Sequence, residues 1–159
     1  MNESVVLRSF ADDDMEIFKK WLSTPHVSAW YHDTQDWIDE VEKRHDEYKW
    51  INHYIVMCDE KPVGFCQYYE YKLSGEEWHG DIELEGTYSI DYLIGEADYL
   101  KKGIGRRIVL ELILLIRREN NAKRIIVQPE ADNSASCATL SSAGFTLHDA
   151  DNNVYLLEL

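Results

Sequence analysis

The sequence predicts an α/β (α+β) fold built as a single domain over residues 1–159. The length of the chain suits one domain with one buried core. Hydrophobic residues make up 45% of the chain and charged residues 29%, which is ordinary for a globular protein. In the second half, apolar runs of strand length alternate with segments of helical periodicity, as the pairing of parallel strands requires.

The first part of the chain is predicted to form one strand and two helices. Residues 4–10 have the apolar pattern of a strand. Asp12 stands where a helix N-cap is expected, and apolar residues then recur at helical spacing, which predicts a helix over residues 13–22. The same periodicity predicts a second helix over residues 34–48, opened by Thr34.

The middle of the chain is predicted to form a hairpin, a loop and a further strand. Two apolar runs, at residues 54–58 and 63–71, flank a turn-like segment at 59–62. Residues 73–86 are polar, acidic and contain glycine, so we expect a mobile loop there. A strand follows at residues 88–95.

The last part of the chain is predicted to alternate helices with strands. The longest helix is predicted over residues 103–120, and a short helix over residues 133–143. A short buried strand is predicted between them at residues 124–128. Two closing strands follow, at residues 145–147 and 153–159.

The charge of the chain is strongly unbalanced. It carries 30 acidic and 16 basic side chains, a formal net charge of -14. Such a surface repels nucleic acid and anionic membranes and attracts cations. We therefore expect a small cationic amine as partner, with neither nucleic acid nor membrane. The alternative is that the acidity only keeps the protein soluble.

Three features bear on the cellular compartment. The first ten residues lack the basic start and long apolar run of a signal peptide. The longest apolar stretch, residues 108–116, is too short to span a bilayer. The three cysteines have no metal-ligand spacing. We expect a cytoplasmic protein with reduced thiols and no metal, either a monomer or a homodimer.

A glycine-containing turn at the start of the longest predicted helix is the strongest local motif. A helix N-terminus carries unpaired N–H groups and partial positive charge, and Gly103 and Gly105 let a phosphate approach the backbone closely. Four basic side chains surround the turn: Lys101, Lys102, Arg106 and Arg107. Neither a Walker loop nor a G-x-G-x-x-G fingerprint is present. By spacing alone, a purely structural turn is an equally good interpretation.

Here the chain resembles the GCN5-related N-acetyltransferases, the GNAT superfamily. The family loop R/Q-x-x-G-x-G/A, which cradles the pyrophosphate of coenzyme A, is matched by residues 100–105, although Leu100 replaces the usual Arg or Gln. A second signature, an Asn that opens a helix ending in Gly-Phe, is matched by Asn133 and by Gly144 with Phe145. The resemblance implies acetyl-CoA as cofactor. It also implies a central mixed, mostly antiparallel sheet flanked by about four helices, with the CoA cleft between splayed parallel strands.

A more specific resemblance is to the aminoglycoside 6'-N-acetyltransferases. It rests on separated segments in the right order: Trp21-Leu22, His26, Trp30-Tyr31, residues 64–69, Trp78 in an acidic loop, and Ile90-Asp91 through Gly105. The implied activity is acetyl transfer to a primary amine of an aminoglycoside, the 6'-amine, which gives antibiotic resistance. Two alternatives remain open. One is the same chemistry on a polyamine, amino-sugar or siderophore precursor, and the other is a catalytically weak acyl-CoA-binding module.

The resemblance assigns roles to residues of the predicted strand and helix. Asp91 corresponds to the base beside the attacked amine, although an ordinary strand-end Asp paired with a basic side chain is the alternative. A backbone N–H near Leu93 or Ile94 would hold the thioester oxygen. Asn133 would bond the pantetheine arm, or serve only as a helix cap. The implied cofactor-binding residues are Leu93, Ile94, Lys101, Lys102, Gly103, Ile104, Gly105, Arg106 and Asn133.

Aromatic and polar side chains are the candidates for binding the amine substrate. Stacking and cation–π contacts suit sugars and ammonium groups. The expected substrate-binding residues are Trp30, Tyr31, Gln67, Glu77, Trp78 and Asp91. For the aromatic residues, packing in the core is the alternative. The acidic stretch 74–86 would then be only a solvated loop.

The chain departs from the family pattern at two positions. Leu140 stands where the family places a tyrosine that protonates the leaving thiolate, and Gln128 stands where an Asp is expected before Pro129. A thiolate is a fairly stable leaving group, with a reference pKa of about 8.5, so an acid is helpful but not obligatory. Tyr92 and two other tyrosines, Tyr99 and Tyr155, are candidates for a replacement.

Overall fold

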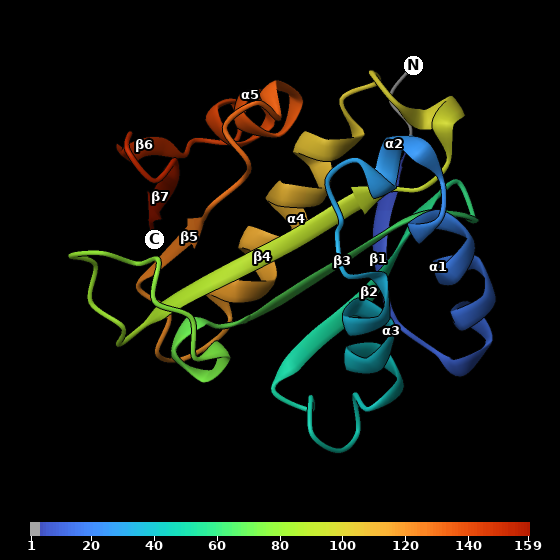
Figure 1. Cartoon of the computed structure of the whole chain (residues 1–159), viewed down its shortest axis with the longest axis horizontal. Helices are drawn as coiled ribbons and strands as arrows, with labels where there is room; N and C mark the ends of the chain where they lie inside the picture. The colour runs from blue at the N-terminus through green and yellow to red at the C-terminus, as the bar shows by residue number, and fades with distance from the viewer. Residues whose placement is uncertain (1–3) are drawn as a thin grey trace.

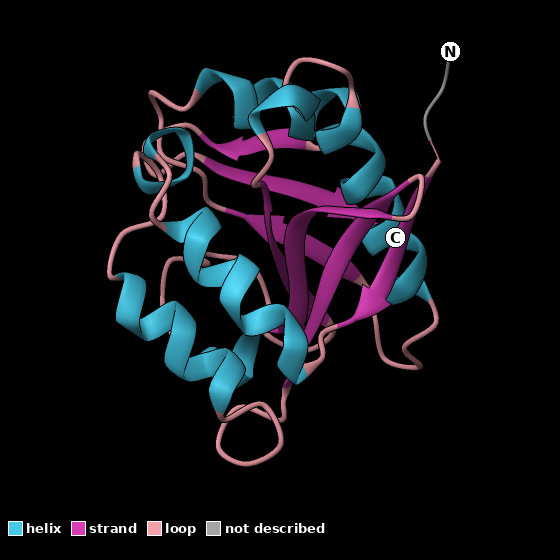
Figure 2. Cartoon of the chain, turned by 90° about the vertical axis from the view of Figure 1, so that its right-hand side faces the viewer, coloured by secondary structure: helices cyan, strands magenta, loops and turns pink. Residues whose placement is uncertain are grey.

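A computed structural model describes residues 4–159, which form a seven-stranded sheet with helices on both faces (Figures 1 and 2). The strands are β1 (Val5–Ser9), β2 (Ile51–Cys58), β3 (Lys61–Glu70), β4 (Thr87–Ile94), β5 (Arg124–Val127), β6 (Thr146–Asp149) and β7 (Val154–Glu158). The helices are α1 (Met15–Leu22), α2 (Pro25–Ser28), α3 (Thr34–Glu42), α4 (Ile104–Arg117) and α5 (Ser134–Ser142). None of these helices is long and apolar enough to cross a membrane.

The sheet is mixed and mostly antiparallel, as expected. Its strand order is β1-β2-β3-β4-β5-β7-β6, and the β4–β5 pair is parallel while its other neighbouring pairs are antiparallel. The parallel pair is short: Thr87 pairs with Arg124 and Tyr88 with Ile125. Beyond Tyr88, β4 continues beside β3 and β5 continues beside β7. The two parallel strands therefore splay apart, which confirms the predicted fold class.

The two faces of the sheet carry different helices and different cores. Alternate residues of a strand point to opposite faces. Leu93 of β4 packs with Phe18 of α1 and Ile38 of α3, whereas Ile90 packs with Ile108 and other apolar residues of α4. Helices α1 to α3 thus cover the face that carries odd-numbered β4 residues, and α4 covers the opposite face (Figure 1).

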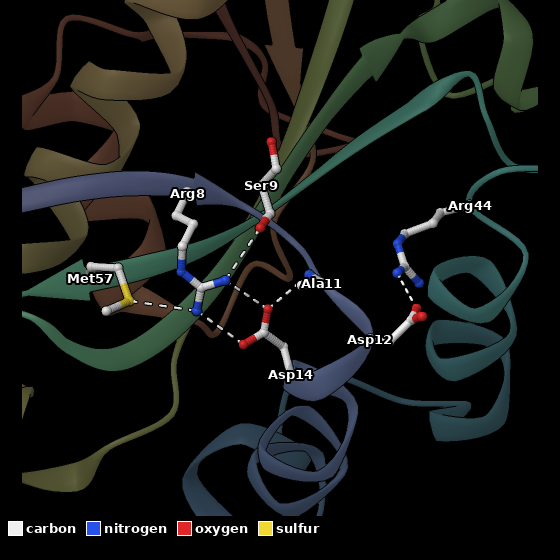
Figure 3. A network of polar contacts seen from close by, with 7 residues as sticks. All are labelled: Arg8, Ser9, Ala11, Asp12, Asp14, Arg44 and Met57. Atoms are coloured by element: carbon white, nitrogen blue, oxygen red, sulfur yellow. Dashed lines mark hydrogen bonds and ion pairs between the residues drawn. The ribbon is translucent and has the colours of Figure 1, made fainter.

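The start of α1 differs from the prediction. Asp12 is not an N-cap but the first residue of a 3-10 turn, Asp12–Asp14, and α1 begins at Met15. The reason is the side chain of Asp14, which accepts the Ala11 N–H at 2.8 Å and two N–H groups of Arg8 at 2.8 and 3.0 Å (Figure 3). This ion pair ties the turn to β1.

Two other helix predictions need correction. The helix predicted over residues 34–48 ends at Glu42, and residues 43–50 form turns. Val41 is the last buried apolar residue of the helix, and the polar residues that follow have no core to cover. The prediction also missed α2, which has four residues starting at Pro25 and is too short to show a period.

The acidic stretch after β3 is attached to the rest of the molecule. Its first residues form a 3-10 turn, Tyr71–Ser74, and Ile82 is buried with Tyr71 and Ile126. Trp78 packs against the Tyr71 ring in an edge-on contact, with the centroids 4.9 Å apart. The stretch therefore contributes a small core of its own and is not only a solvated loop.

Candidate active site

A cleft of about 750 Å³ opens where β4 and β5 diverge. Residues 90–94 of β4, the start of α4 and the solvent-facing side of α5 line it. Among the predicted cofactor-binding residues, the lining includes Leu93, Ile94, Lys101, Gly103, Ile104, Gly105, Arg106 and Asn133. The predicted glycine turn and the predicted strand thus form one concave surface.

The N-terminus of α4 is built to hold an anion. Gly103 is its N-cap, with φ 76°, and being a glycine it has no side chain to cap the first turn. Lys101 is also left-handed, with φ 61°, so the loop turns its N–H groups toward a common side. A Cβ added at Gly103 would meet nothing within 4 Å among residues 4–159, its chain neighbours and the helix's own backbone aside. The backbone at this turn is therefore open to close approach by a ligand, and the first N–H groups of a helix lack partners within the helix.

The basic residues around this turn divide between two environments. Lys101 and Arg106 line the cleft, and the Arg106 Nε donates to the Ser142 carbonyl at 3.2 Å. Lys102 lies outside the lining, with its Nζ 5.4 Å from the centre of the Tyr99 ring. Lys101 and Arg106 are therefore better placed than Lys102 to face a phosphate in the cleft.

The edge of β4 that faces away from β3 carries polar backbone groups. The Tyr31 hydroxyl donates to the Tyr92 carbonyl, and a ring nitrogen of His26 lies 2.9 Å from the Ile94 carbonyl. In a strand, the N–H and C=O of one residue point to the same side. The N–H groups of Tyr92 and Ile94 therefore face the cleft, whereas that of Leu93 faces β3.

The first turn of α5 also lines the cleft. Asn133 is its N-cap, and its Oδ1 accepts the Ser136 N–H at 3.2 Å. The Tyr92 hydroxyl lies 3.1 Å from the Ser136 hydroxyl, so Tyr92 spans the distance between β4 and α5. Leu140 is fully buried in the core behind them.

A second cavity, of about 450 Å³, lies next to the cleft and is acidic and aromatic. Its carboxylates come from three segments: Glu40 of α3, Glu76 of the acidic stretch and Asp91 of β4. Its aromatic lining is Trp37, Tyr48, Trp50, Tyr69 and Trp78. Such a chamber suits a ligand with several positive charges and apolar faces.

The cleft and the acidic chamber share one wall, formed by Trp37, Ile90, Asp91, Val127 and Gln128. Asp91 is the carboxylate of that wall. Its Oδ2 accepts a hydrogen bond from Gln67 Nε2 at 2.9 Å. A group held at Asp91 is therefore accessible from both cavities.

The environment of Asp91 shifts its proton affinity toward neutrality. Burial raises the pKa of this carboxyl to about 7, the Gln67 hydrogen bond lowers it in part, and the negative charges of Glu40 and Glu76 raise it again. Burial, with Asp36 and Glu76, also raises the pKa of Glu40 to about 7. Near neutral pH the chamber can therefore both hold cations and accept a proton.

The predicted substrate residues divide between the two cavities. Gln67 and Trp78 line the acidic chamber, Trp30 and Tyr31 line the cleft, and Asp91 lines both. Glu77 lines neither cavity; its neighbour Glu76 lines the chamber instead.

Sequence reasoning missed Glu40 and most of the aromatic wall. Glu40 lies three residues after Trp37 in a helix whose apolar face was recognised, so its helical position was available. Glu40 and Asp91 are far apart in the sequence and come together only when α3 packs over the sheet, which local sequence patterns do not predict.

The comparisons with known proteins agree with this fold. It is the fold of an acyltransferase, and the model of the Acetyltransferase (GNAT) domain family matches residues 11–150. The chain belongs to this family. The aminoglycoside N(6')-acetyltransferase type 1 of Klebsiella pneumoniae is 26% identical over 150 residues, covering 91% of this chain and 75% of the relative. The protein of the same name from Serratia marcescens gives the same values.

Solved structures share the fold. AAC(6')-Ib in complex with coenzyme A and kanamycin superimposes with a TM-score of 0.81 at 24% identity, covering 98% of this chain and 95% of that one. The aminoglycoside N(6')-acetyltransferase of Legionella pneumophila has a TM-score of 0.75 at 20% identity, with 100% and 93% coverage.

Proposed function

We propose that this protein transfers the acetyl group of acetyl-CoA to a primary amine of an aminoglycoside, the 6'-amine. One observation carries the proposal: Asp91 stands in the wall between a cleft with an anion-binding helix end and a chamber with carboxylates and aromatic rings. The names of the relatives, and the aminoglycoside and coenzyme A in the solved complexes, support the same pairing of ligands.

The cleft has the donors that coenzyme A requires. The N–H groups at the start of α4, with Lys101 and Arg106, would hold its phosphates. Asn133, which lines the cleft, would bond the pantetheine arm. The bound thioester supplies the acetyl group. The Ile94 N–H, on the open edge of β4, would donate to the carbonyl oxygen as negative charge develops on it.

Asp91 would act as the base for the attacking amine. An amine must lose a proton to become a nucleophile, and a carboxyl with a pKa near 7 is half ionised at neutral pH. The ionised Asp91 would accept that proton. Glu40 and Glu76 would hold other ammonium groups of the substrate, which orients the reacting amine toward the cleft.

Tyr92 is the best-placed replacement for the missing family tyrosine. It lines the cleft and its hydroxyl reaches Ser136 on α5, whereas Tyr99 lies beneath Lys61 and Lys102. Burial raises the pKa of Tyr92, so the hydroxyl stays protonated and can donate to a leaving thiolate. Tyr92→Phe should therefore lower kcat for CoA release about 10²-fold or more.

The experiment that tests the proposal measures CoA release from acetyl-CoA. Wild type and Asp91→Asn would each be assayed with kanamycin, tobramycin, gentamicin and spermidine. Turnover on compounds with a 6'-amine, reduced at least about 10²-fold in the variant, is the expected result. Turnover on spermidine alone would assign the enzyme to polyamines. Acetyl-CoA binding without turnover on any amine would indicate a binding module instead.

A further inference from the structure

Three polar side chains lie in one row across the centre of the sheet. His53 of β2 is directly opposite Gln67 of β3, and Gln67 is directly opposite Asp91 of β4. Directly opposed residues of antiparallel strands project from the same face. The three side chains therefore share the face covered by α1 to α3, and the row leads from the interior to the proposed base.

Gln67, the middle member, has only one of its two polar ends satisfied. Its Nε2 donates to Asp91, but its Oε1 is buried and has no hydrogen-bond partner among residues 4–159. The side chain is 2% exposed, so bulk water does not replace that partner. A buried acceptor left unpaired is costly, which points to a donor close by.

His53 has the complementary deficit. It is 6% exposed, and within the described part of the chain neither ring nitrogen makes a hydrogen bond of acceptable distance and angle. Its ring stacks on Phe65, with the centroids 5.9 Å apart. Gln67 acts to raise the pKa of His53, as a hydrogen-bond acceptor beside the ring does. The unpaired ring nitrogens and the unpaired Oε1 thus belong to directly opposed residues of neighbouring strands.

The surroundings keep the His53 ring neutral. Burial lowers the pKa of His53 to about 4; Gln67 opposes this change, and the positive charge of Arg44 adds to it. Arg44 forms an ion pair with Asp12 (Figure 3). A neutral imidazole has one N–H donor and one acceptor nitrogen. At neutral pH His53 can thus donate to Gln67 while adding no charge near Asp91.

We propose that His53 is a positioning residue, whose ring N–H donates to Gln67 Oε1 and so holds the Gln67 amide with its N–H toward Asp91. The effect on catalysis rests on the proposed function, but the effect on Asp91 does not. The hydrogen bond from Gln67 stabilises the ionised carboxylate against Glu40 and Glu76, which disfavour it. An amide free to rotate would present this donor for only part of the time.

The test measures the pKa of Asp91 directly, by carbon-13 NMR of its carboxyl in the ligand-free protein. His53→Phe keeps a ring on Phe65 and removes the donor, and it should raise the pKa of Asp91 by about 0.5–1 unit, the worth of one hydrogen bond. His53→Asn and His53→Gln restore an amide donor on side chains of two lengths, and one of them should return the pKa of Asp91 toward the wild-type value. His45→Phe, at an exposed position, is the matched control and should leave it unchanged.

Epistasis separates positioning from general damage. Gln67→Leu should itself raise the pKa of Asp91, and in that background His53→Phe should add no further shift. A pKa of Asp91 that is unchanged in His53→Phe, or shifted equally in all three His53 variants, would overturn the proposal.

If His53→Phe does not fold, nitrogen-15 NMR of the wild-type ring decides the question. A ring N–H whose chemical shift and exchange rate change in Gln67→Leu supports the hydrogen bond, and values that are the same in both proteins overturn it. Failure to acetylate any aminoglycoside would contradict the proposed function alone, because both NMR measurements need no turnover.

Discussion

At the scale of single residues, the carboxyl of Asp91 combines accessibility with a raised proton affinity. It borders two cavities, yet burial and the charges of Glu40 and Glu76 bring its pKa to about 7. Because the base must be ionised, kcat/KM should fall about tenfold per pH unit below that value. Glu40→Gln removes a neighbouring negative charge, so the acidic limb of the pH profile should move to lower pH. A limb that stays in place would contradict the coupling of these carboxylates.

Asp14 supports stability rather than chemistry. Burial acts to raise the pKa of Asp14, but hydrogen bonds from Arg8 and the Ala11 amide, with the charges of Arg8 and Arg44, give a net lowering. Asp14→Asn should lower the free energy of unfolding by about 1–3 kcal/mol at pH 7. Thermal unfolding measures this loss. Asp13→Asn, at an exposed position in the same turn, is the control and should change little.

The pH dependence of this loss has a definite sign. A group whose folded-state pKa is lowered stabilises the fold above its unfolded pKa, about 3.9 for Asp, and the contribution is lost as pH falls through the folded value. The difference in Tm between wild type and Asp14→Asn should therefore shrink as the pH falls below about 4. An unchanged difference in that range would show that the ion pair is not its cause.

At the scale of elements, the end of β4 fits closely against α1. A Cβ added to Gly95 would lie 2.1 Å from Cγ of Trp21, whose side chain is fully buried and whose Nε1 donates to Glu96 at 2.6 Å. Gly95→Ala should therefore cost at least about 3 kcal/mol of unfolding free energy, the upper part of the range for overpacking. Denaturant titration tests this, and a loss below about 1 kcal/mol would show that α1 can shift to make room.

The glycine at the start of α4 has a different purpose. Gly103→Ala meets no neighbour, so it should cost only the left-handed backbone penalty of about 1–2 kcal/mol. Because a phosphate must approach the backbone of this turn closely, the added methyl group should weaken binding of CoA about tenfold, equal to about 1.4 kcal/mol. Isothermal titration measures the affinity. Gly75→Ala, with φ 74° and equally open surroundings, should carry the same stability cost with unchanged affinity.

The elements differ in how well the sequence predicts them. The strand–turn–helix unit around Gly103 was predicted nearly to its ends, because glycines and apolar periodicity mark it locally. The predicted helix continues beyond Glu42, where α3 ends, because the residues that follow are compatible with a helix. Only the absence of a core for them to pack against ends the helix. Glu40 was missed as a site residue, since its neighbours in the chamber come from other parts of the chain.

At the scale of the whole molecule, the formal net charge of -14 bears on the encounter with substrate. The carboxylates of the acidic chamber add to the negative electrostatic potential at the place where the substrate would bind. For a polycationic aminoglycoside, KM should rise severalfold between 50 and 500 mM salt while kcat changes little, because screening weakens attraction but not chemistry. Steady-state kinetics with a monoamine gives the control, whose KM should depend much less on salt.

The divergence of β4 and β5 also has a consequence for how long the protein survives. The ladder that joins β4 to β5 has two residue pairs, Thr87 with Arg124 and Tyr88 with Ile125. Beyond them each strand keeps an edge inside the molecule, and such edges are weak points for local opening. A ligand bound between β4 and β5 favours the closed native state, and by mass action local opening becomes rarer as the ligand concentration rises. The concentration of that ligand therefore affects how long the protein resists proteolysis as well as its rate of turnover.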